Sequence, residues 1–401
     1  MNLHTISRKA KASIVAASVS AAILGLASCS LDYVVGYVYV TTAKSSPGVI
    51  DQYSIDYQSG ALAQIGTPVA AGNNPVRIVP APNGRFVYVI NQGDSTVQEF
   101  AVQSGGALAS VNKYNTGSHP TALAIDPQGA YLYVTFTYQS GYSATTPGPG
   151  GVNIFPVNAD NSLGSSSTVN VGNNPVGVSV SYYNHFVYVL DQETATTGQI
   201  LGFAQSTSNG ALTPVPGTTI TTVAGKTVAA GYAAGVIPSA IAEEPTSRFV
   251  YVTDEAANQL IGYTVQANGS LVAMINGPFQ AGLFPVNLTI DPTGKLIYVV
   301  NYNANTVEGY AIDTMTGTPS GAVGAFATAL GAGPTCVVVD PALGTNLYTS
   351  NTLDNTVTGE KLSPNTGGLA PVQNSPFLAS GQPTCLAVVP NGAHASQIIT
   401  P

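Results

Sequence analysis

The sequence predicts an all-β protein, a seven-bladed β-propeller whose blades are four-stranded antiparallel sheets. Two repeated features predict this fold. A short run built on Tyr-Val recurs seven times in the 401 residues, and a proline that opens a short apolar strand also recurs seven times. Aromatic and β-branched residues that end at Asn or Asp are typical of a strand followed by a turn. Repeats of this length are typical of propeller blades.

The two repeated features complete each other at the ends of the chain. The Tyr-Val runs lie at 37–40, 86–91, 131–134, 186–191, 249–254, 296–301 and 346–351. The prolines are Pro75, Pro120, Pro175, Pro238, Pro285, Pro334 and Pro383. No Tyr-Val run follows Pro383, and no proline strand precedes the run at 37–40. We therefore expect the strand at 384–389 to pair with the strand at 37–40, which closes the ring and leaves only short sheet edges.

Each repeat supplies four strands in order. In one repeat they are expected at 75–79, 86–90 and 96–102, with the fourth after the turn Gly106-Ala107-Leu108. The turn between the first two strands contains a glycine, as in Asn83-Gly84, which a tight hairpin requires.

The composition fits a large all-β core and excludes some partners. The chain has 44% hydrophobic and only 7% charged residues, with 43 Gly, 27 Pro and no Trp. A chain of this length buries enough apolar surface to fold despite its low charge. The net charge of -8 argues against nucleic acid, because phosphate binding needs a basic surface. We find no metal-ligand spacing and no phosphate-binding loop, and we expect no cofactor.

The N-terminus has the features of an export signal. Arg8, Lys9 and Lys11 precede an apolar run at 12–26, which is too short for a membrane-spanning helix. The Leu-Ala-Ser-Cys tetrad that ends at Cys29 resembles the bacterial lipoprotein box. The alternative is an ordinary secretory signal with an incidental cysteine.

The lipoprotein resemblance implies four parts of the chain. They are a signal peptide at 1–28, a tether at 29–36 after a lipidated Cys29, the propeller at 37–390 and a tail at 391–401. It also implies an exported protein that is attached to the outer membrane only by its lipid and faces the periplasm or the cell surface.

The repeats resemble the YVTN and lactonase-like β-propeller family. The copies in that family read Tyr-Val-Thr-Asn, followed by a Thr-Val strand and a Gly-Ala-Leu turn. The matching pairs and turns here are Thr96-Val97, Thr306-Val307, Thr356-Val357, Gly60-Ala61-Leu62, Gly106-Ala107-Leu108 and Gly210-Ala211-Leu212. The resemblance covers about residues 37–390 and implies the propeller fold. It also suggests lactone hydrolysis of the phosphogluconolactonase kind, although one fold serves many functions.

One face of the predicted ring collects the candidate functional residues. The strand order places the segment before each proline strand and the loop after each Tyr-Val run on this face, called here the upper face. The catalytic candidates are Arg77, His119, Asp191, Glu193, Asp254 and Glu255. The ligand-binding candidates are Asn74, Asn91, Asn174, Asn287 and Asn301. A carboxylate or histidine near an arginine could activate water and stabilise an oxyanion. The alternative is that Asn and Asp here only cap turns.

Two longer insertions, at 137–151 and 216–236, are also expected on the upper face, either as lids over a pocket or as tolerated surface loops. A phosphorylated ligand is disfavoured, because Arg77 is the only cation well placed there and its surroundings are acidic. Cys336 and Cys385 occupy identical positions in adjacent repeats, so their side chains are expected to point the same way as free buried thiols.

Two functions follow as hypotheses. The first is a lipid-anchored, monomeric binding or scaffolding module whose upper face contacts a protein or a small molecule such as a carbohydrate or a lactone. The alternative is a lactone hydrolase of the phosphogluconolactonase-like kind. A third, weaker possibility is a propeller that binds or oxidises sugars with a cofactor, but the sequence names no cofactor.

Overall fold

The structure is a computed structural model that describes residues 34–322, 327–392, 394, 396–397 and 399. The chain divides into a compact unit at 35–401 and a separate N-terminal unit, and only the former is described below. The predicted signal peptide and Cys29 lie outside the described residues. Among these residues no helix is long and apolar enough to cross a membrane.

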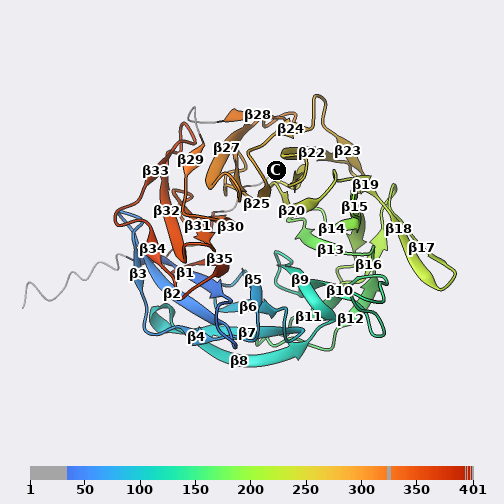
Figure 1. Cartoon of the computed structure of the whole chain (residues 1–401), viewed down its shortest axis with the longest axis horizontal. Helices are drawn as coiled ribbons and strands as arrows, with labels where there is room; N and C mark the ends of the chain where they lie inside the picture. Colours follow the sequence, from blue (N-terminus) through green and yellow to red (C-terminus); the bar gives the residue numbers. More distant parts are fainter. Residues whose placement is uncertain (1–33, 323–326, 393, 395, 398, 400–401) are drawn as a thin grey trace, which may run out of the picture. The chain divides into compact units, whose positions relative to one another are not determined.

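Seven four-stranded sheets, named blades A to G, make up the described fold (Figure 1). Blade A contains β35 (Pro383–Pro390), β1 (Val34–Thr42), β2 (Val49–Asp56) and β3 (Leu62–Gln64). Blade B contains β5 (Pro75–Pro80), β6 (Phe86–Asn91), β7 (Thr96–Val102) and β8 (Leu108–Asn115). Blade C contains β9 (Ser118–Ile125), β10 (Tyr131–Tyr138), β11 (Gly151–Pro156) and β12 (Ser167–Asn170). Blade D contains β13 (Pro175–Val180), β14 (Phe186–Thr194), β15 (Thr197–Gln205) and β16 (Leu212–Pro214).

The remaining blades follow the same plan. Blade E contains β20 (Pro238–Glu243), β21 (Phe249–Asp254), β22 (Gln259–Val265) and β23 (Leu271–Ala273). Blade F contains β25 (Pro285–Ile290), β26 (Leu296–Asn301), β27 (Thr306–Ile312) and β28 (Pro319–Ala322). Blade G contains β30 (Pro334–Val339), β31 (Asn346–Asn351), β32 (Thr356–Leu362) and β33 (Leu369–Pro371). Short outer segments, β4 (Val69–Ala70), β19 (Tyr232–Ala233), β24 (Phe279–Gln280), β29 (Thr328–Ala329) and β34 (Phe377–Leu378), extend five blades.

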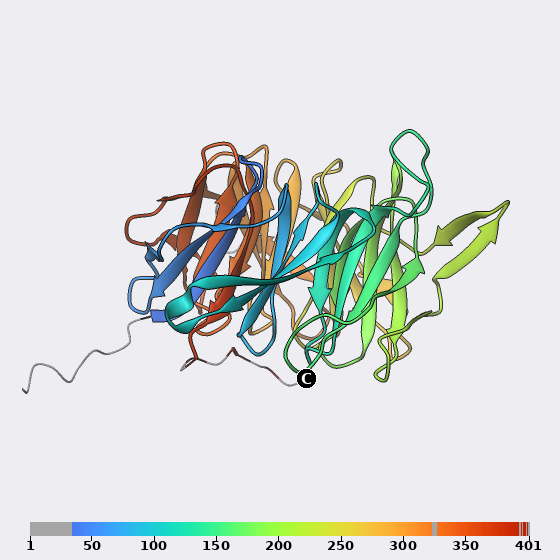
Figure 2. The ribbon, with the colours of Figure 1, turned by 90° about the horizontal axis from the view of Figure 1, so that it is seen from below.

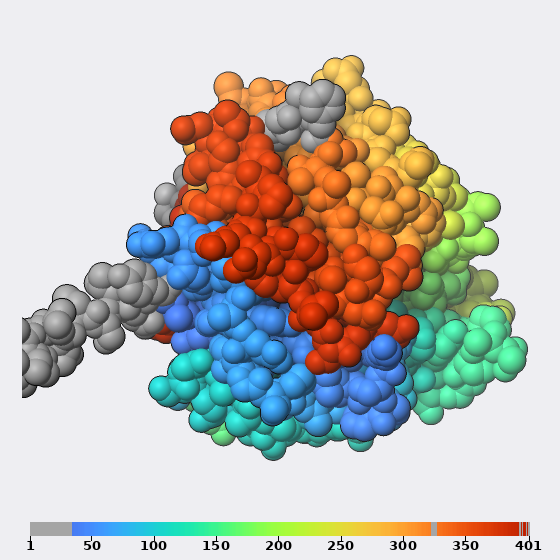
Figure 3. Space-filling view, turned by 60° about the vertical axis from the view of Figure 1, so that its left-hand side comes forward, coloured from blue at the N-terminus to red at the C-terminus, as the bar shows by residue number. Residues whose placement is uncertain are grey.

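The ring closes as the sequence predicts. Strand β1 pairs antiparallel with β35, with Tyr39 opposite Ala387 and Thr41 opposite Cys385. Each innermost strand contacts the next one around the ring, and β35 contacts β5. Figure 3 shows the blue start of the described chain beside the red segments from its end. The predicted seven-bladed all-β propeller is therefore confirmed.

The tyrosine of each Tyr-Val run joins its blade to the next. These seven side chains are all fully buried. Their hydroxyls donate to a carbonyl in the turn between the third and fourth strands of the next blade. The pairs are Tyr39–Gly106, Tyr88–Asn161, Tyr133–Gly210, Tyr188–Gly269, Tyr251–Gly317, Tyr298–Gly367 and Tyr348–Gly60, at 2.6 to 3.0 Å. The tyrosines of the Tyr-Val runs thus help to build the interfaces between blades.

The prediction of free cysteines is wrong. Cys336 in β30 and Cys385 in β35 form a disulfide, with their Cα atoms 4.9 Å apart. The innermost strands of adjacent blades lie side by side, so identical positions meet at the same height on the ring. This proximity brings the two side chains within bridging distance. The disulfide joins blade G to blade A, the blade formed by the two ends of the chain.

The two insertions extend in different directions (Figure 2). The loop between β10 and β11 stands at the top of Figure 2, on the upper face, as expected. The second insertion forms the hairpin β17 (Thr219–Val223) and β18 (Lys226–Ala230), which projects sideways from the ring. The described C-terminal residues lie on the opposite, lower face, where Gln397 N–H donates to Pro341 O and Tyr183 Oη donates to Ile399 O.

Candidate functional site

A pocket opens on the upper face between blades C and D. It has a volume of about 470 Å³. Its lining includes His119, Tyr138, Asn173, Asn174, Gln192 and Glu193. This C–D pocket brings together three of the predicted residues, His119, Asn174 and Glu193. An adjoining cavity of about 470 Å³ shares Asn173 and Glu193 with it and reaches Lys226 at the tip of the β17–β18 hairpin.

The C–D pocket lies where the repeated loop structure is interrupted. In three consecutive blades, an asparagine in the loop before the third strand accepts a backbone N–H from the next blade. The pairs are Asn258–Phe284 at 2.7 Å, Asn305–Gly333 at 2.8 Å and Asn355–Gln382 at 2.6 Å. In blade C the insertion at 137–151 takes the place of the corresponding loop. In blade D, strands β14 and β15 are longer and occupy the corresponding segment. The altered loops leave room for the pocket.

Glu193 lies in the pocket wall within a polar network. Its Oε2 accepts from the Asn173 backbone N–H at 3.2 Å, and its Oε1 accepts from Asn173 Nδ2 at 3.0 Å. Gln199 Nε2 donates both to Glu193 Oε2 at 3.1 Å and to Asp191 Oδ2 at 3.0 Å. One amide therefore links the two carboxyl groups.

Asp191 lies behind Glu193, fully buried. Its Oδ1 accepts from the Asn174 backbone N–H at 2.9 Å. Burial, followed by the neighbouring Glu193, raises the pKa of Asp191 to about 7. The carboxyl pair can therefore hold a proton near neutral pH, and its two titrations are coupled.

His119 is the second residue of β9, at the end of the strand on the upper face. Its backbone is in a left-handed conformation, with φ of 61°. Its ring lies 6.0 Å from the Tyr138 ring. Desolvation lowers the pKa of His119, so its imidazole is neutral at pH 7 and able to accept a proton.

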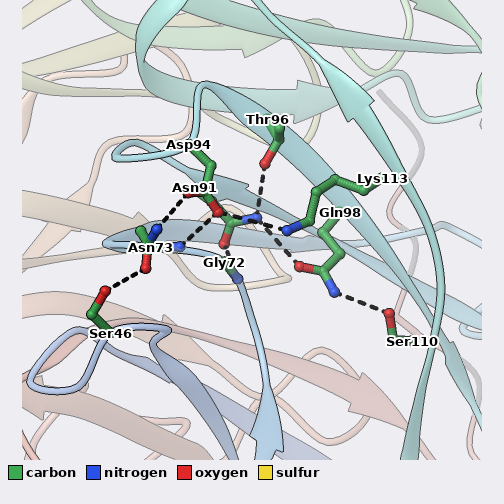
Figure 4. Close-up of polar contacts among 9 residues, drawn as sticks. All are labelled: Ser46, Gly72, Asn73, Asn91, Asp94, Thr96, Gln98, Ser110 and Lys113. Atoms are coloured by element: carbon green, nitrogen blue, oxygen red, sulfur yellow. Dashed lines mark hydrogen bonds and ion pairs between the residues drawn. The ribbon is translucent and has the colours of Figure 1, made fainter.

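Several other predicted residues anchor loops (Figure 4). The Oδ1 atom of Asn91 accepts from the Gly72 backbone N–H at 2.9 Å, and its Nδ2 donates to Thr96 and Gln98. Asp254 accepts from three backbone N–H groups, those of Val236, Ile237 and Ala256. Asn91, Asp254 and Asn301 are fully buried. These contacts favour the turn-capping alternative for Asn91 and Asp254.

A glycine that the sequence argument overlooked makes this anchoring possible. It stands three residues before the proline, as in Gly72, Gly172 and Gly235. A Cβ on Gly72 would lie 2.5 Å from Asn91 Cγ, and one on Gly172 would lie 1.9 Å from Asp191 Oδ2. The fixed spacing between this glycine and the proline is the signal that could have revealed the loop anchor.

The remaining candidates lie apart from the C–D pocket. Arg77 lies in β5, where its Nη1 donates to Val76 O at 3.3 Å, and desolvation lowers its pKa. Asn287 Oδ1 accepts from the Val337 N–H of the next blade. Asn74 Nδ2 donates to Gln92 Oε1 on the rim of blade B. Glu255 is half-buried in blade E, where burial raises its pKa.

The charges of the described residues argue against a metal or phosphate centre. They contain no group of three or more His, Cys, Asp or Glu arranged to hold a metal ion. The described side chains that line the C–D pocket include no Lys or Arg. The ion pair found within the described part of the chain joins Lys113 and Asp94 at 3.6 Å, in blade B.

Comparison with known proteins agrees with the fold. The family model for the lactonase, 7-bladed beta-propeller, matches residues 37–167 and 216–339. A 6-phosphogluconolactonase from Bacillus subtilis (strain 168) is 24% identical over 237 residues, which are 57% of this chain and 61% of that protein. The chain thus matches about three fifths of the length of that relative.

Two solved structures show the same architecture. A protein from Bacteroides uniformis ATCC 8492 superposes with a TM-score of 0.72 at 19% identity, over 88% of this chain and 99% of the other. The periplasmic gluconolactonase of Pseudomonas aeruginosa gives a TM-score of 0.69 at 19% identity, also over 88% and 99%. Together with the family model, this agreement shows that the chain belongs to the lactonase family of seven-bladed β-propellers.

Proposed function

We propose that the chain hydrolyses a lactone in the C–D pocket. The observation that carries the proposal is that His119 and Glu193 line one cavity where the loops depart from the repeat, and that Gln199 links Glu193 to the buried Asp191. Family membership supports the same reaction class. The proposed active site is therefore confined to the interface between blades C and D and does not extend over the whole upper face.

The pocket residues have the chemistry that ester-ring opening requires. Neutral His119 takes a proton from the attacking water, whose oxygen bonds to the lactone carbonyl carbon. The side-chain amides of Asn174 and Gln192 are the nearby donors for the oxyanion that forms. When the ring C–O bond breaks, Glu193 supplies a proton to the departing alkoxide, and the product is a hydroxy acid.

The substrate is a lactone without a phosphate group. Phosphate recognition needs several cations or backbone donors, with arginine preferred. The described lining of the C–D pocket offers no cation, and Arg77 lies elsewhere in blade B. The Bacillus relative is named for a phosphorylated substrate, so its specificity does not carry over.

A binding module without catalysis is the second candidate. Both carboxylate oxygens of Glu193 already accept hydrogen bonds from Asn173 and Gln199. This satisfied network favours a rigid recognition surface over a reactive acid. It is the specific observation in favour of the scaffolding hypothesis.

We also propose that the protein is exported and attached to the membrane by a lipid on Cys29. The Cys336–Cys385 disulfide supports an oxidising compartment, because the cytosol keeps most thiols reduced. Replacement Cys29→Ser should release the protein from the membrane fraction. Retention of the variant in that fraction would remove the lipid anchor from the proposal.

Turnover measurements separate the two functions. Glucono-1,5-lactone and its 6-phosphate are offered to the wild type, His119→Gln and Glu193→Gln, with His185→Gln on the lower face as the control. We expect turnover of the unphosphorylated lactone to fall at least about 100-fold in both pocket variants and not in the control. Saturable binding with no turnover above the spontaneous rate would establish the binding module instead.

A further inference from the structure

The upper rim carries a repeated pair of residues with different side chains in different blades. In several blades the residue before the inner strand accepts, through its carbonyl, the N–H of a residue near or just after the end of the second strand of the same blade. This bond joins Asn74 to Gln92, Asn174 to Gln192 and Phe284 to Tyr302, each at 2.9 Å. We call the two residues a rim pair. The backbone is thus constant while the side chains vary.

The rim pairs of blades B, D and F carry uncharged side chains of two kinds, whereas the pair of blade E, Ile237 and Glu255, includes a carboxyl group. Blades B and D present amides, with Asn74 Nδ2 2.9 Å from Gln92 Oε1 and Asn174 Nδ2 3.3 Å from Gln192 Oε1. Blade F presents two aromatic rings, Phe284 and Tyr302, with centroids 6.2 Å apart and planes inclined at 56°. In the order of the blades, blade E separates blade F from blade D and the C–D pocket.

The backbone does not require an aromatic residue at this place. Phe284 has a φ of 61°, a left-handed conformation that disfavours a bulky side chain. Blade G holds the same conformation with Gly333, at 64°. Asn258 Oδ1, from the preceding blade, accepts the Phe284 N–H at 2.7 Å and fixes the strained residue. Strain that the fold could avoid with glycine points to a functional side chain.

The surroundings of this pair are apolar and open to solvent. Leu283 is 59% exposed and Leu353 is 62% exposed. A Cβ placed on Gly333 would lie 2.6 Å from Leu353 Cγ and 3.1 Å from Tyr302 Cε2, so both side chains border Gly333. The nearby Asp354 carboxylate is already bonded to the Ala332 N–H at 2.8 Å and to Thr356. The side chains that border the Phe284–Tyr302 pair are therefore mainly apolar, and the oxygens of the nearby Asp354 carboxylate are bonded to groups of its own blade.

We propose that the Phe284–Tyr302 platform binds an uncharged saccharide chain, as a subsite separate from the C–D pocket. Aromatic faces stack against the C–H faces of sugar rings, and side-chain amides bond sugar hydroxyls in pairs of donor and acceptor. The rim pair of blade B, Asn74 and Gln92, supplies such amides on the same face. The net charge of -8 and the Glu255 carboxyl group in the rim pair of blade E disfavour an anionic chain.

Calorimetric titration with maltohexaose, cellohexaose and chitohexaose tests the platform on the full chain. We expect wild-type protein to bind at least one of them, and Phe284→Gly and Tyr302→Ala each to weaken that binding at least ten-fold. Met315→Ala, which removes an 87% exposed side chain from a turn on the lower face, is the matched control and should bind as the wild type does.

Phe284→Gly also separates recognition from folding, because glycine adopts the left-handed conformation without strain. Its urea midpoint should stay close to that of the wild type while binding is lost. Absence of wild-type binding to all three hexaoses, or equal binding by wild type and Phe284→Gly, would overturn the proposal. Neither outcome bears on lactone turnover, which is measured separately.

Discussion

The hydroxyl of Tyr348 donates a hydrogen bond to the carbonyl oxygen of Gly60 at 2.7 Å, although the two residues are 288 positions apart. The bond joins blade G to blade A and completes the set of seven equivalent bonds around the ring. In a repeat protein, stability comes largely from such contacts between neighbouring repeats. The ring is thus held by the same bond at its closure as at its other interfaces.

Removal of one such hydroxyl should destabilise the ring measurably. Tyr348→Phe leaves the buried Gly60 carbonyl without this donor, so the free energy of unfolding should fall by about 1–3 kcal/mol. Urea denaturation of the two proteins measures the difference. Tyr57→Phe, at an exposed tyrosine, is the control and should have little effect. Equal effects of the two substitutions would contradict a stabilising role for the interblade bond.

The repeat could be predicted from the sequence. The residues that each repeated side chain contacts in other blades and loops could be predicted only in part. Period and composition mark Tyr348 and Gly60 as repeated residues, but only the closed ring shows that one repeat bonds the next. Asn91 follows a strand in a pattern that suits a ligand site as well as a turn. Its burial depends on Gly72, which lies in a different loop.

The candidate site was less predictable because irregular loops build it. Both His119 and Glu193 could be placed on the upper face from the strand order. Their selection over Arg77 depends on the insertion in blade C and on the extended hairpin of blade D. Neither conformation follows from the repeat. The prediction of free thiols at Cys336 and Cys385 was wrong for a related reason. The periodicity of a strand gives no information about its distance from a strand in another blade.

The Cys336–Cys385 disulfide should stabilise the closure of the ring. It spans 49 residues and joins the blade formed by both chain ends to its neighbour. Cross-links of this kind contribute about 2–4 kcal/mol to the free energy of unfolding. Denaturation in the presence and absence of dithiothreitol should show this loss. The double variant Cys336→Ala, Cys385→Ala should be insensitive to the reductant, and a wild type equally insensitive would refute the contribution.

Glu360 occupies a position that aromatic residues fill in other blades. It stands opposite Leu347 in β31, as Tyr310 stands opposite Ile297 and Phe203 opposite Val187. The side chain is buried, and within the described structure its Oε2 has no hydrogen-bond partner. Burial raises the pKa of Glu360 from its ordinary value of 4.5 to about 7. As the pH rises, the Glu360 carboxyl group therefore keeps its proton to a higher pH in the folded chain than in the unfolded chain.

Replacement Glu360→Tyr should stabilise the protein above neutral pH. Because the raised pKa belongs to the folded state, this carboxyl makes the free energy of unfolding decrease as the pH rises from about 4.5 to about 7. The tyrosine removes that contribution. Urea midpoints at pH 5 and pH 8 should therefore differ less in the variant than in the wild type. A gap as large as in the wild type would exclude Glu360 as a source of the pH dependence.

The pH profile of lactone turnover tests the roles assigned to His119 and the carboxyl pair. Turnover should rise with pH as His119 loses its proton, below its ordinary pKa because desolvation lowers it. It should fall near pH 7, where the Asp191–Glu193 pair loses its last proton. Asp191→Asn keeps an acceptor for the Asn174 N–H but removes the like charge beside Glu193. The variant therefore lacks the buried carboxyl group whose pKa is about 7, and the falling limb of kcat/KM should move toward acid. A falling limb that stays at the same pH in this variant would show that another group controls the proton.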